Sequence, residues 1–211
     1  MPRPPRIEYP GALYHITSRG NEKKNIYTYD QDRMTFLDIL HDATDEYNWI
    51  CHAYCLLNNH YHILIETPDA NLSAGMKQLN GNYAQIYNKT HSRVGHLFGG
   101  RFGSIIIEKD PHLFEVARYV VLNPVRAGLV DQPKNWIWSS YHATAGLDKT
   151  PDFLNTKWTL ELFSNSEKKA REEYKYFVSD GIKASSPFKS LVKDPILGSR
   201  QFKDKIKKHI K

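Results

Sequence analysis

Two histidines, His60 and His62, flank a tyrosine at the start of an apolar segment. Alternate side chains of a β-strand share one face, so both imidazoles project the same way, about 6.6 Å apart along the chain. Two imidazoles at that spacing can share a divalent metal ion, but histidine has several other uses. Taken alone, the pair therefore fits a metal site or two surface or hydrogen-bonded histidines.

A second pair, Tyr119 and Asn123, stands four residues apart in a helical pattern, so both side chains share one helix face. A phenol beside a metal-bound phosphate can act as a nucleophile, and an amide oxygen can be a hard metal ligand. The alternative is a tyrosine that packs on a sheet and an asparagine that caps a helix end. The two residues alone do not decide between these interpretations.

Residue patterns predict the elements that must position these groups. Alternation predicts a strand over 12–18, and helical periodicity predicts a helix over 31–47, with Asp30 as its N-cap. Two further strands, 49–57 and 61–67, are joined by a tight turn at Asn58-Asn59.

A second helix is predicted from the apolar stripe of Leu72, Met76, Leu79, Tyr83 and Ile86. A fourth strand follows over 101–109. A third helix is expected to begin at Asp110-Pro111 and to stop near Asn123, before Pro124. This order is that of an α+β, ferredoxin-like split βαβ fold: an antiparallel sheet with two helices and an added helix that carries the tyrosine.

Charge divides the chain unevenly. The net charge is +6, yet residues 1–150 hold 15 basic and 15 acidic side chains, so the whole excess lies in residues 151–211. We expect a catalytic domain over 1–145 and a basic, mostly helical C-terminal extension over 146–211. The extension could be a DNA clamp, an autoinhibitory flap over the site or a handle for a partner, or simply a solvated helical tail.

Composition excludes several classes of protein. The chain is 40% hydrophobic, enough for a core, but has no apolar run of the roughly 18 residues that would span a bilayer. The first residues lack the apolar segment of a secretory signal. Cys51 and Cys55 would lie about 13 Å apart in a strand, too far for a disulfide. We therefore expect a cytoplasmic protein with free thiols and no membrane partner.

Four blocks of sequence together resemble one known family, the single-tyrosine HUH transposases, and most closely their REP-associated tyrosine transposase branch. The resemblance covers about residues 6 to 145. The blocks are Tyr14-His-Ile-Thr-Ser-Arg-Gly-Asn21, Leu57-Asn-Asn-His-Tyr-His-Ile-Leu-Ile65, Arg118-Tyr-Val-Val-Leu-Asn-Pro-Val-Arg-Ala-Gly-Leu-Val130 and Trp138-Ser-Ser-Tyr141. One departure is Tyr61, between the histidines, where a smaller aliphatic residue or threonine is more usual.

The resemblance implies a role for each matching residue. His60, His62 and Asn123 would hold Mg²⁺ or Mn²⁺, and Tyr119 would attack the scissile phosphate of single-stranded DNA to give a 5′-phosphotyrosine. The branch implies substrates with REP-like hairpins and a monomer, whereas some relatives are homodimers. His15, on the strand predicted beside the histidine pair, could orient a metal ligand or serve the sheet alone.

Five cations are candidate DNA contacts, because guanidinium and ammonium groups bind phosphate. They are Arg19, Lys77, Arg101, Arg118 and Arg126. Two rival functions remain open at this stage: a non-catalytic module that binds single-stranded DNA or RNA on a ferredoxin-like sheet, and a nuclease that uses water in place of Tyr119.

Overall fold

The central sheet carries the histidines, and its strands are ordered β2-β3-β1-β4-β5. In this computed structural model, which describes residues 6–189, 191 and 195–208, β1 (Ala12–Arg19) lies between β3 (His60–Thr67) and β4 (Gly103–Ile107) and is antiparallel to both. β2 (Ile50–Leu56) pairs with β3. The predicted antiparallel core of an α+β, ferredoxin-like fold is confirmed.

A fifth strand was not predicted. β5 (Ile196–Leu197) comes from the C-terminal extension and pairs in parallel with β4. Two residues are too few for a readable alternation, so tertiary pairing rather than local sequence defines this strand. The extension therefore completes the sheet edge as well as adding helices.

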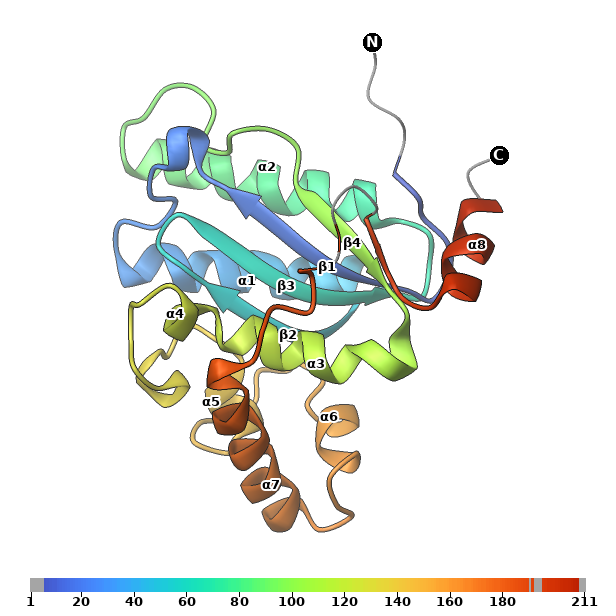
Figure 1. Cartoon of the computed structure of the whole chain (residues 1–211). Coiled ribbons are helices and arrows are strands. Elements are labelled where there is room, and N and C mark those ends of the chain that lie inside the picture. The colour runs from blue at the N-terminus through green and yellow to red at the C-terminus, as the bar shows by residue number, and fades with distance from the viewer. Residues whose placement is uncertain (1–5, 190, 192–194, 209–211) are drawn as a thin grey trace.

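Two helices, α1 (Asp30–Glu46) and α2 (Leu72–Thr90), cover one face of the sheet (Figure 1). Between them and the strands lies a core of large apolar side chains that includes Phe36, Tyr61 and Tyr83. The Asp30 prediction was wrong in detail: Asp30 is the first helical residue, and the N-cap is Tyr29. Asp32 instead receives the backbone N–H groups of Thr28 and Tyr29 at 2.7 and 2.8 Å.

The buried stripe of α2 differs from the prediction at its last position. Ile86 is 43% exposed, and Tyr87 takes the core position. Ile86 and Tyr87 lie at about equal angles on the two sides of this stripe, so packing against the rest of the protein, and not the helical period, decides which of them is buried. Earlier in the helix, Gly75 permits a close approach, since a Cβ there would lie 2.2 Å from the ring of Trp49.

The other face of the sheet is covered by α3 (Lys109–Val121), whose Leu113, Val116 and Val120 pack on β2 and β3 (Figure 1). The helix begins one residue before Asp110, with Glu108 as N-cap. It ends at Val121, and Leu122 separates it from α4 (Asn123–Arg126). Pro124 does not prevent a new helix from starting there, because a proline in the first helical turn lacks only an N–H that would have no partner within the helix.

The remaining helices follow the sheet in sequence. They are α5 (Tyr141–Thr144), α6 (Lys157–Glu161), α7 (Glu167–Asp180) and α8 (Arg200–Lys208), with short 3₁₀ turns at Asn21–Lys23, Pro133–Asn135 and Gly181–Lys183. Tyr141, Tyr174 and Val178 form a third apolar cluster with the end of α3. The extension therefore packs against the helix that carries Tyr119.

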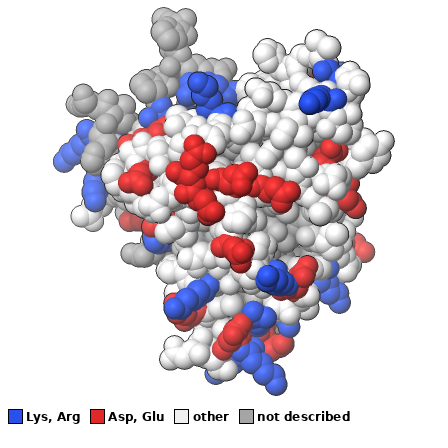
Figure 2. Space-filling view, turned by 180° about the vertical axis from the view of Figure 1, so that it is seen from behind, with Lys and Arg blue, Asp and Glu red and all other residues white. Residues whose placement is uncertain are grey.

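The face formed by α1 and α2 is acidic at its surface. Figure 2 shows acidic side chains gathered across the middle of this face, where α1 exposes Asp38, Asp42, Asp45 and Glu46. Such a surface repels a polyanion. Within the described chain no helix is long and apolar enough to cross a membrane, and both cysteines are free and buried.

Candidate active site between β1, β3 and α3

Strand alternation places three imidazoles on the face that α3 covers. His15 of β1 and His62 of β3 are 4% and 6% exposed, whereas Tyr14 and Tyr61 beside them point into the α1/α2 core. His60 opens β3 opposite Arg19 of β1 and is partly exposed. The predicted shared face of His60 and His62 is confirmed, since their rings approach to 5.1 Å.

His15 and His62 are bonded to each other. Nε2 of His15 and Nδ1 of His62 share a 2.9 Å hydrogen bond, and the two rings are stacked. Burial lowers the pKa of His15 to about 3 and the pKa of His62 well below its usual value. Burial, with a contribution from Arg19, also lowers the pKa of His60 to about 4. All three imidazoles are therefore neutral near pH 7, the form that can donate a lone pair to a metal.

The histidine pair fits a divalent cation. Nε2 of His62 is buried and has no hydrogen-bond partner, an arrangement that costs free energy unless something binds there. Nδ1 of His60 pairs with Oδ1 of Asn59 at 2.6 Å, which leaves its other ring nitrogen to face a ligand. Across the described residues, no group of three or more His, Cys, Asp or Glu could hold a metal, so further donors would be amide, water or phosphate oxygens.

Tyr119 lies against His15 and His62. Its ring is half-buried on α3 and meets the rings of His15 and His62 edge-on, with centroids 5.9 and 6.0 Å apart. The guanidinium of Arg126 lies 5.1 Å from the centroid of the tyrosine ring. Tyr119 and the histidines of β3 are about sixty residues apart in the sequence. The structure therefore brings together the side chains that the sequence analysis selected.

Both ends of α3 are held in ways that orient this tyrosine. At its start, Lys109 pairs with Glu66 of β3, which also accepts from His52. The hydrogen bond with His52, more than the charge of Lys109, holds the pKa of Glu66 below its usual value. At its end, the amide nitrogen of Asn123 donates to the carbonyls of Tyr119 and Val120 at 2.9 and 3.2 Å.

This contact gives Asn123 the helix-capping position that was the alternative to metal ligation. No hydrogen bond within the described residues joins Asn123 to either histidine. Its role as a metal ligand stays a prediction.

One further residue at this site was not predicted from the sequence. Phe188, from the C-terminal extension, stacks on His15 with ring centroids 4.7 Å apart and meets Tyr119 edge-on at 5.1 Å. Arg126 holds the same segment by donating to the carbonyl of Ala184 at 2.8 Å. The extension therefore contacts His15, Tyr119 and Arg126, and its role as a flap over the site stays a prediction.

The five candidate DNA cations fall into different settings. Arg19 is exposed beside His60, and Arg126 borders Tyr119. Lys77 and Arg101 line one surface hollow near the N-terminal segment. Arg118 is largely engaged within the protein, since it pairs with Glu115 and its guanidinium lies 4.2 Å from the ring of Phe177. Contact of each with DNA stays a prediction.

Comparison with known proteins gives concordant matches. The family model for IS200-like transposases matches residues 9–123. A Haemophilus influenzae protein named as a REP-associated tyrosine transposase is 24% identical over 160 residues, which cover 67% of this chain and 86% of that protein.

One solved structure shares the fold. A REP-associated tyrosine transposase bound to a REP hairpin superposes with a TM-score of 0.59 at 18% identity, over 72% of this chain and 89% of that one. A transposase from Deinococcus radiodurans gives a TM-score of only 0.40 at 16% identity, over 56% and 95% of the two chains. The family match spans more than half of the sequence and contains His15, the histidine pair and Tyr119, so this chain belongs to the IS200-like transposase family.

Proposed function

We propose that this transposase cuts single-stranded DNA beside a hairpin and transfers the strand through a covalent bond to Tyr119. The observation that supports this is the 6.0 Å approach of the Tyr119 ring to His62, whose outer nitrogen is buried and unpartnered. A nucleophile and a metal-binding pair are thereby adjacent on one face of the sheet.

The chemistry follows from the residues present. Oη of Tyr119 attacks the phosphorus in line, so the Oη–P bond forms as the P–O3′ bond breaks. The electron pair goes to the 3′ oxygen, which leaves as a 3′-hydroxyl after it takes a proton, and the phenol proton is lost to solvent. Since the phosphotyrosine keeps one phosphodiester bond for each one broken, a 3′-hydroxyl from another strand can reverse the step without ATP.

His60 and His62 would hold Mg²⁺ or Mn²⁺, with Asn123 as a further candidate. A bound cation would polarise the phosphate and stabilise charge on its oxygens. His15 would act as a positioning residue: its hydrogen bond to Nδ1 fixes the ring of His62 and leaves Nε2 without a partner in the protein.

The substrate is proposed from two relatives. The curated relative is named for REP elements, and the solved neighbour is bound to a REP hairpin. DNA that forms a hairpin next to an unpaired strand is therefore the substrate to test first.

The decisive experiment incubates the protein with a 5′-labelled and a 3′-labelled hairpin oligonucleotide and Mn²⁺, followed by denaturing electrophoresis. We expect a protein–DNA adduct on the side that carries the 5′ phosphate. Tyr119→Phe should remove the adduct while circular dichroism and unfolding stay unchanged. Tyr176→Phe, at an exposed tyrosine of α7, is the matched control.

Each of the two alternative functions predicts a different result in this experiment. Cleavage with free products and no adduct would indicate a nuclease that uses water. Binding that persists in EDTA, without any cleavage in Mg²⁺ or Mn²⁺, would indicate a non-catalytic nucleic-acid-binding module.

A further inference from the structure

A surface groove runs along α2, and neither the site histidines nor Tyr119 line it. Two adjoining hollows form it, with volumes of about 530 and 310 Å³, and both are lined by Gly100. One wall of the groove is formed by residues on a single face of α2, namely Lys77, Asn80, Ala84 and Asn88. At 1.5 Å per residue these span roughly 16 Å. We call this feature the α2 groove.

One end of the α2 groove is basic. Arg6, Lys77 and Arg101 line the smaller hollow, and none of its described lining residues is acidic, although Glu8 lies beside it and accepts from the backbone N–H of Ser73 at 3.1 Å. Burial lowers the pKa of Arg6, the nearby charge of Arg101 lowers it further, and the charge of Glu8 offsets part of this. The two guanidinium groups therefore repel each other, and an anion between them would relieve this repulsion.

Arg6 is also held in place. Its guanidinium lies 3.6 Å from the centroid of the Phe102 ring and donates to Oγ of Ser104 at 2.8 Å. Its Nε is buried without a partner. A fixed cation with an unused donor is suited to an anion such as a backbone phosphate.

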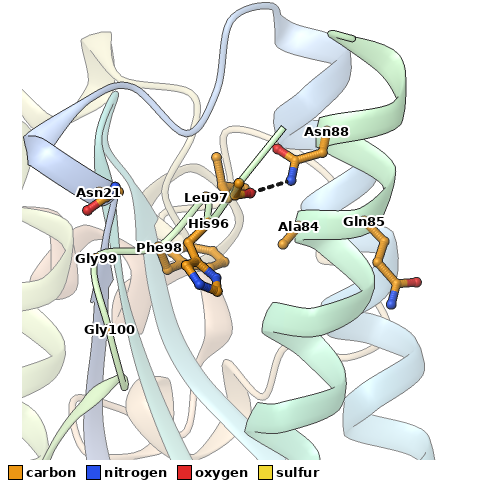
Figure 3. Close-up of a pocket in the computed structure, with 10 residues that line it drawn as sticks. Asn21, Ala84, Gln85, Asn88, His96, Leu97, Phe98, Gly99 and Gly100 are labelled. Carbon is orange, nitrogen blue, oxygen red and sulfur yellow. Dashed lines mark hydrogen bonds between the residues drawn. The ribbon is translucent and has the colours of Figure 1, made fainter. Parts of the chain in front are cut away.

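The other end of the α2 groove is neutral and carries ring and amide groups. Figure 3 shows the rings of Phe98 and His96 between β1 and α2, with Asn21 across from them. Asn88 donates to the carbonyl of Gly95 at 2.9 Å and so fixes the loop that forms the wall. Amides can hydrogen-bond to base edges and rings can stack on base faces, which together suit an unpaired nucleobase.

The neutral end lies close to the histidine pair. Gly99 donates to the carbonyl of Arg19, and Arg19 is the register partner of His60. The segment around Gly99 is thus two strand positions away from His60, about 10 Å. A DNA strand of a few nucleotides can cover that distance.

We propose that the α2 groove binds the unpaired DNA strand next to the cleaved phosphate, with phosphates at the basic end and a base at the neutral end. This inference rests on the proposed function, because it takes DNA as the substrate. It assigns the hairpin flank, rather than the hairpin itself, to the face of α2 that lies away from the acidic surface of α1.

The test measures binding by fluorescence anisotropy in the Tyr119→Phe background, so that cleavage does not contribute. The probes are one hairpin with a single-stranded flank and the same hairpin without it. We expect Lys77→Ala/Arg101→Ala to bind the flanked hairpin at least about tenfold more weakly, and the bare hairpin as before. The slope of the logarithm of the binding constant against the logarithm of the salt concentration should become shallower by about 0.7 for each phosphate contact with the single strand that is lost.

The matched control is Lys168→Ala/Lys169→Ala, which removes two exposed lysines of α7 and should change neither affinity. A second measurement places 5-iodouracil in the flank and maps photo-crosslinks, which we expect at His96 or Phe98. Unchanged affinity for the flanked hairpin, or crosslinks confined to other segments, would overturn the assignment.

The two proposals fail separately. If Tyr119 forms an adduct while the groove variant binds normally, only the groove assignment is wrong. If no adduct forms but the flank still crosslinks to the α2 groove, the catalytic proposal is the one that fails.

Discussion

The two faces of the sheet are built from the same strands yet carry different chemistry. Toward α1 and α2, Tyr14, Tyr61 and Ile63 are fully buried among apolar side chains. Toward α3, His15 and His62 are almost as buried, but each retains a ring nitrogen without a partner. Burying an unpaired polar atom costs about 1–3 kcal/mol. The face toward α3 therefore lowers the stability of the fold at these two atoms, whereas the apolar face toward α1 and α2 raises it.

The largest expected effects come from substituting two neighbouring residues of β3 whose side chains lie on opposite faces of the sheet. His62→Ala should reduce cleavage by at least about 100-fold, since even residues that only orient a metal ligand cost 10–100-fold when mutated. Its unfolding free energy should fall less than that of Tyr61→Ala, because the lost hydrogen bond to His15 is partly offset by removal of the unpaired Nε2. Tyr61→Ala should lower that free energy by about 3–5 kcal/mol, because it empties a fully buried aromatic site.

Adduct yield and urea unfolding measure the two effects independently. His41→Ala, at a half-exposed histidine of α1, controls for loss of an imidazole elsewhere and should change neither. A His62 variant that unfolds as easily as the Tyr61 variant would contradict the division of the faces.

The first face could be predicted from sequence far better than the second. The alternation of Tyr61 and Ile63, and the stripe from Leu72 to Tyr83, report burial directly because apolar side chains recur with the period of their element. Errors fell at the start of α1, where Tyr29 and not Asp30 is the N-cap, and at the last position of the α2 stripe, where Tyr87 is buried in place of Ile86.

The second face needed tertiary information. The spacing of His60 and His62 predicted a shared side, and the family resemblance joined them to Tyr119. Nothing in the sequence indicated Phe188, since a contact between segments over a hundred residues apart has no periodic signature. Asn123 was ambiguous because the same amide can cap a helix or bind a metal.

A pair of glycines in α2 tests how tightly the first face is packed. Gly75→Ala should destabilise the protein by about 1–3 kcal/mol, since its Cβ would lie 2.2 Å from the ring of Trp49. Gly81→Ala meets nothing within 4 Å and should stabilise the helix by about 0.5–1 kcal/mol. Thermal unfolding of the two variants checks this. Equal shifts would mean that helix propensity, and not the contact with Trp49, controls this face.

The smallest expected effect concerns the cover of the second face. Phe188→Ala removes a ring that packs on both His15 and Tyr119. Such a ring pair contributes about 0.5–1.5 kcal/mol, so if DNA must displace it, adduct formation should become about two- to tenfold faster. Tyr176→Ala, an exposed aromatic of the same extension, should leave the rate unchanged. A slower Phe188 variant would instead show that the ring supports the site, because its loss then lets the imidazoles and the phenol move apart.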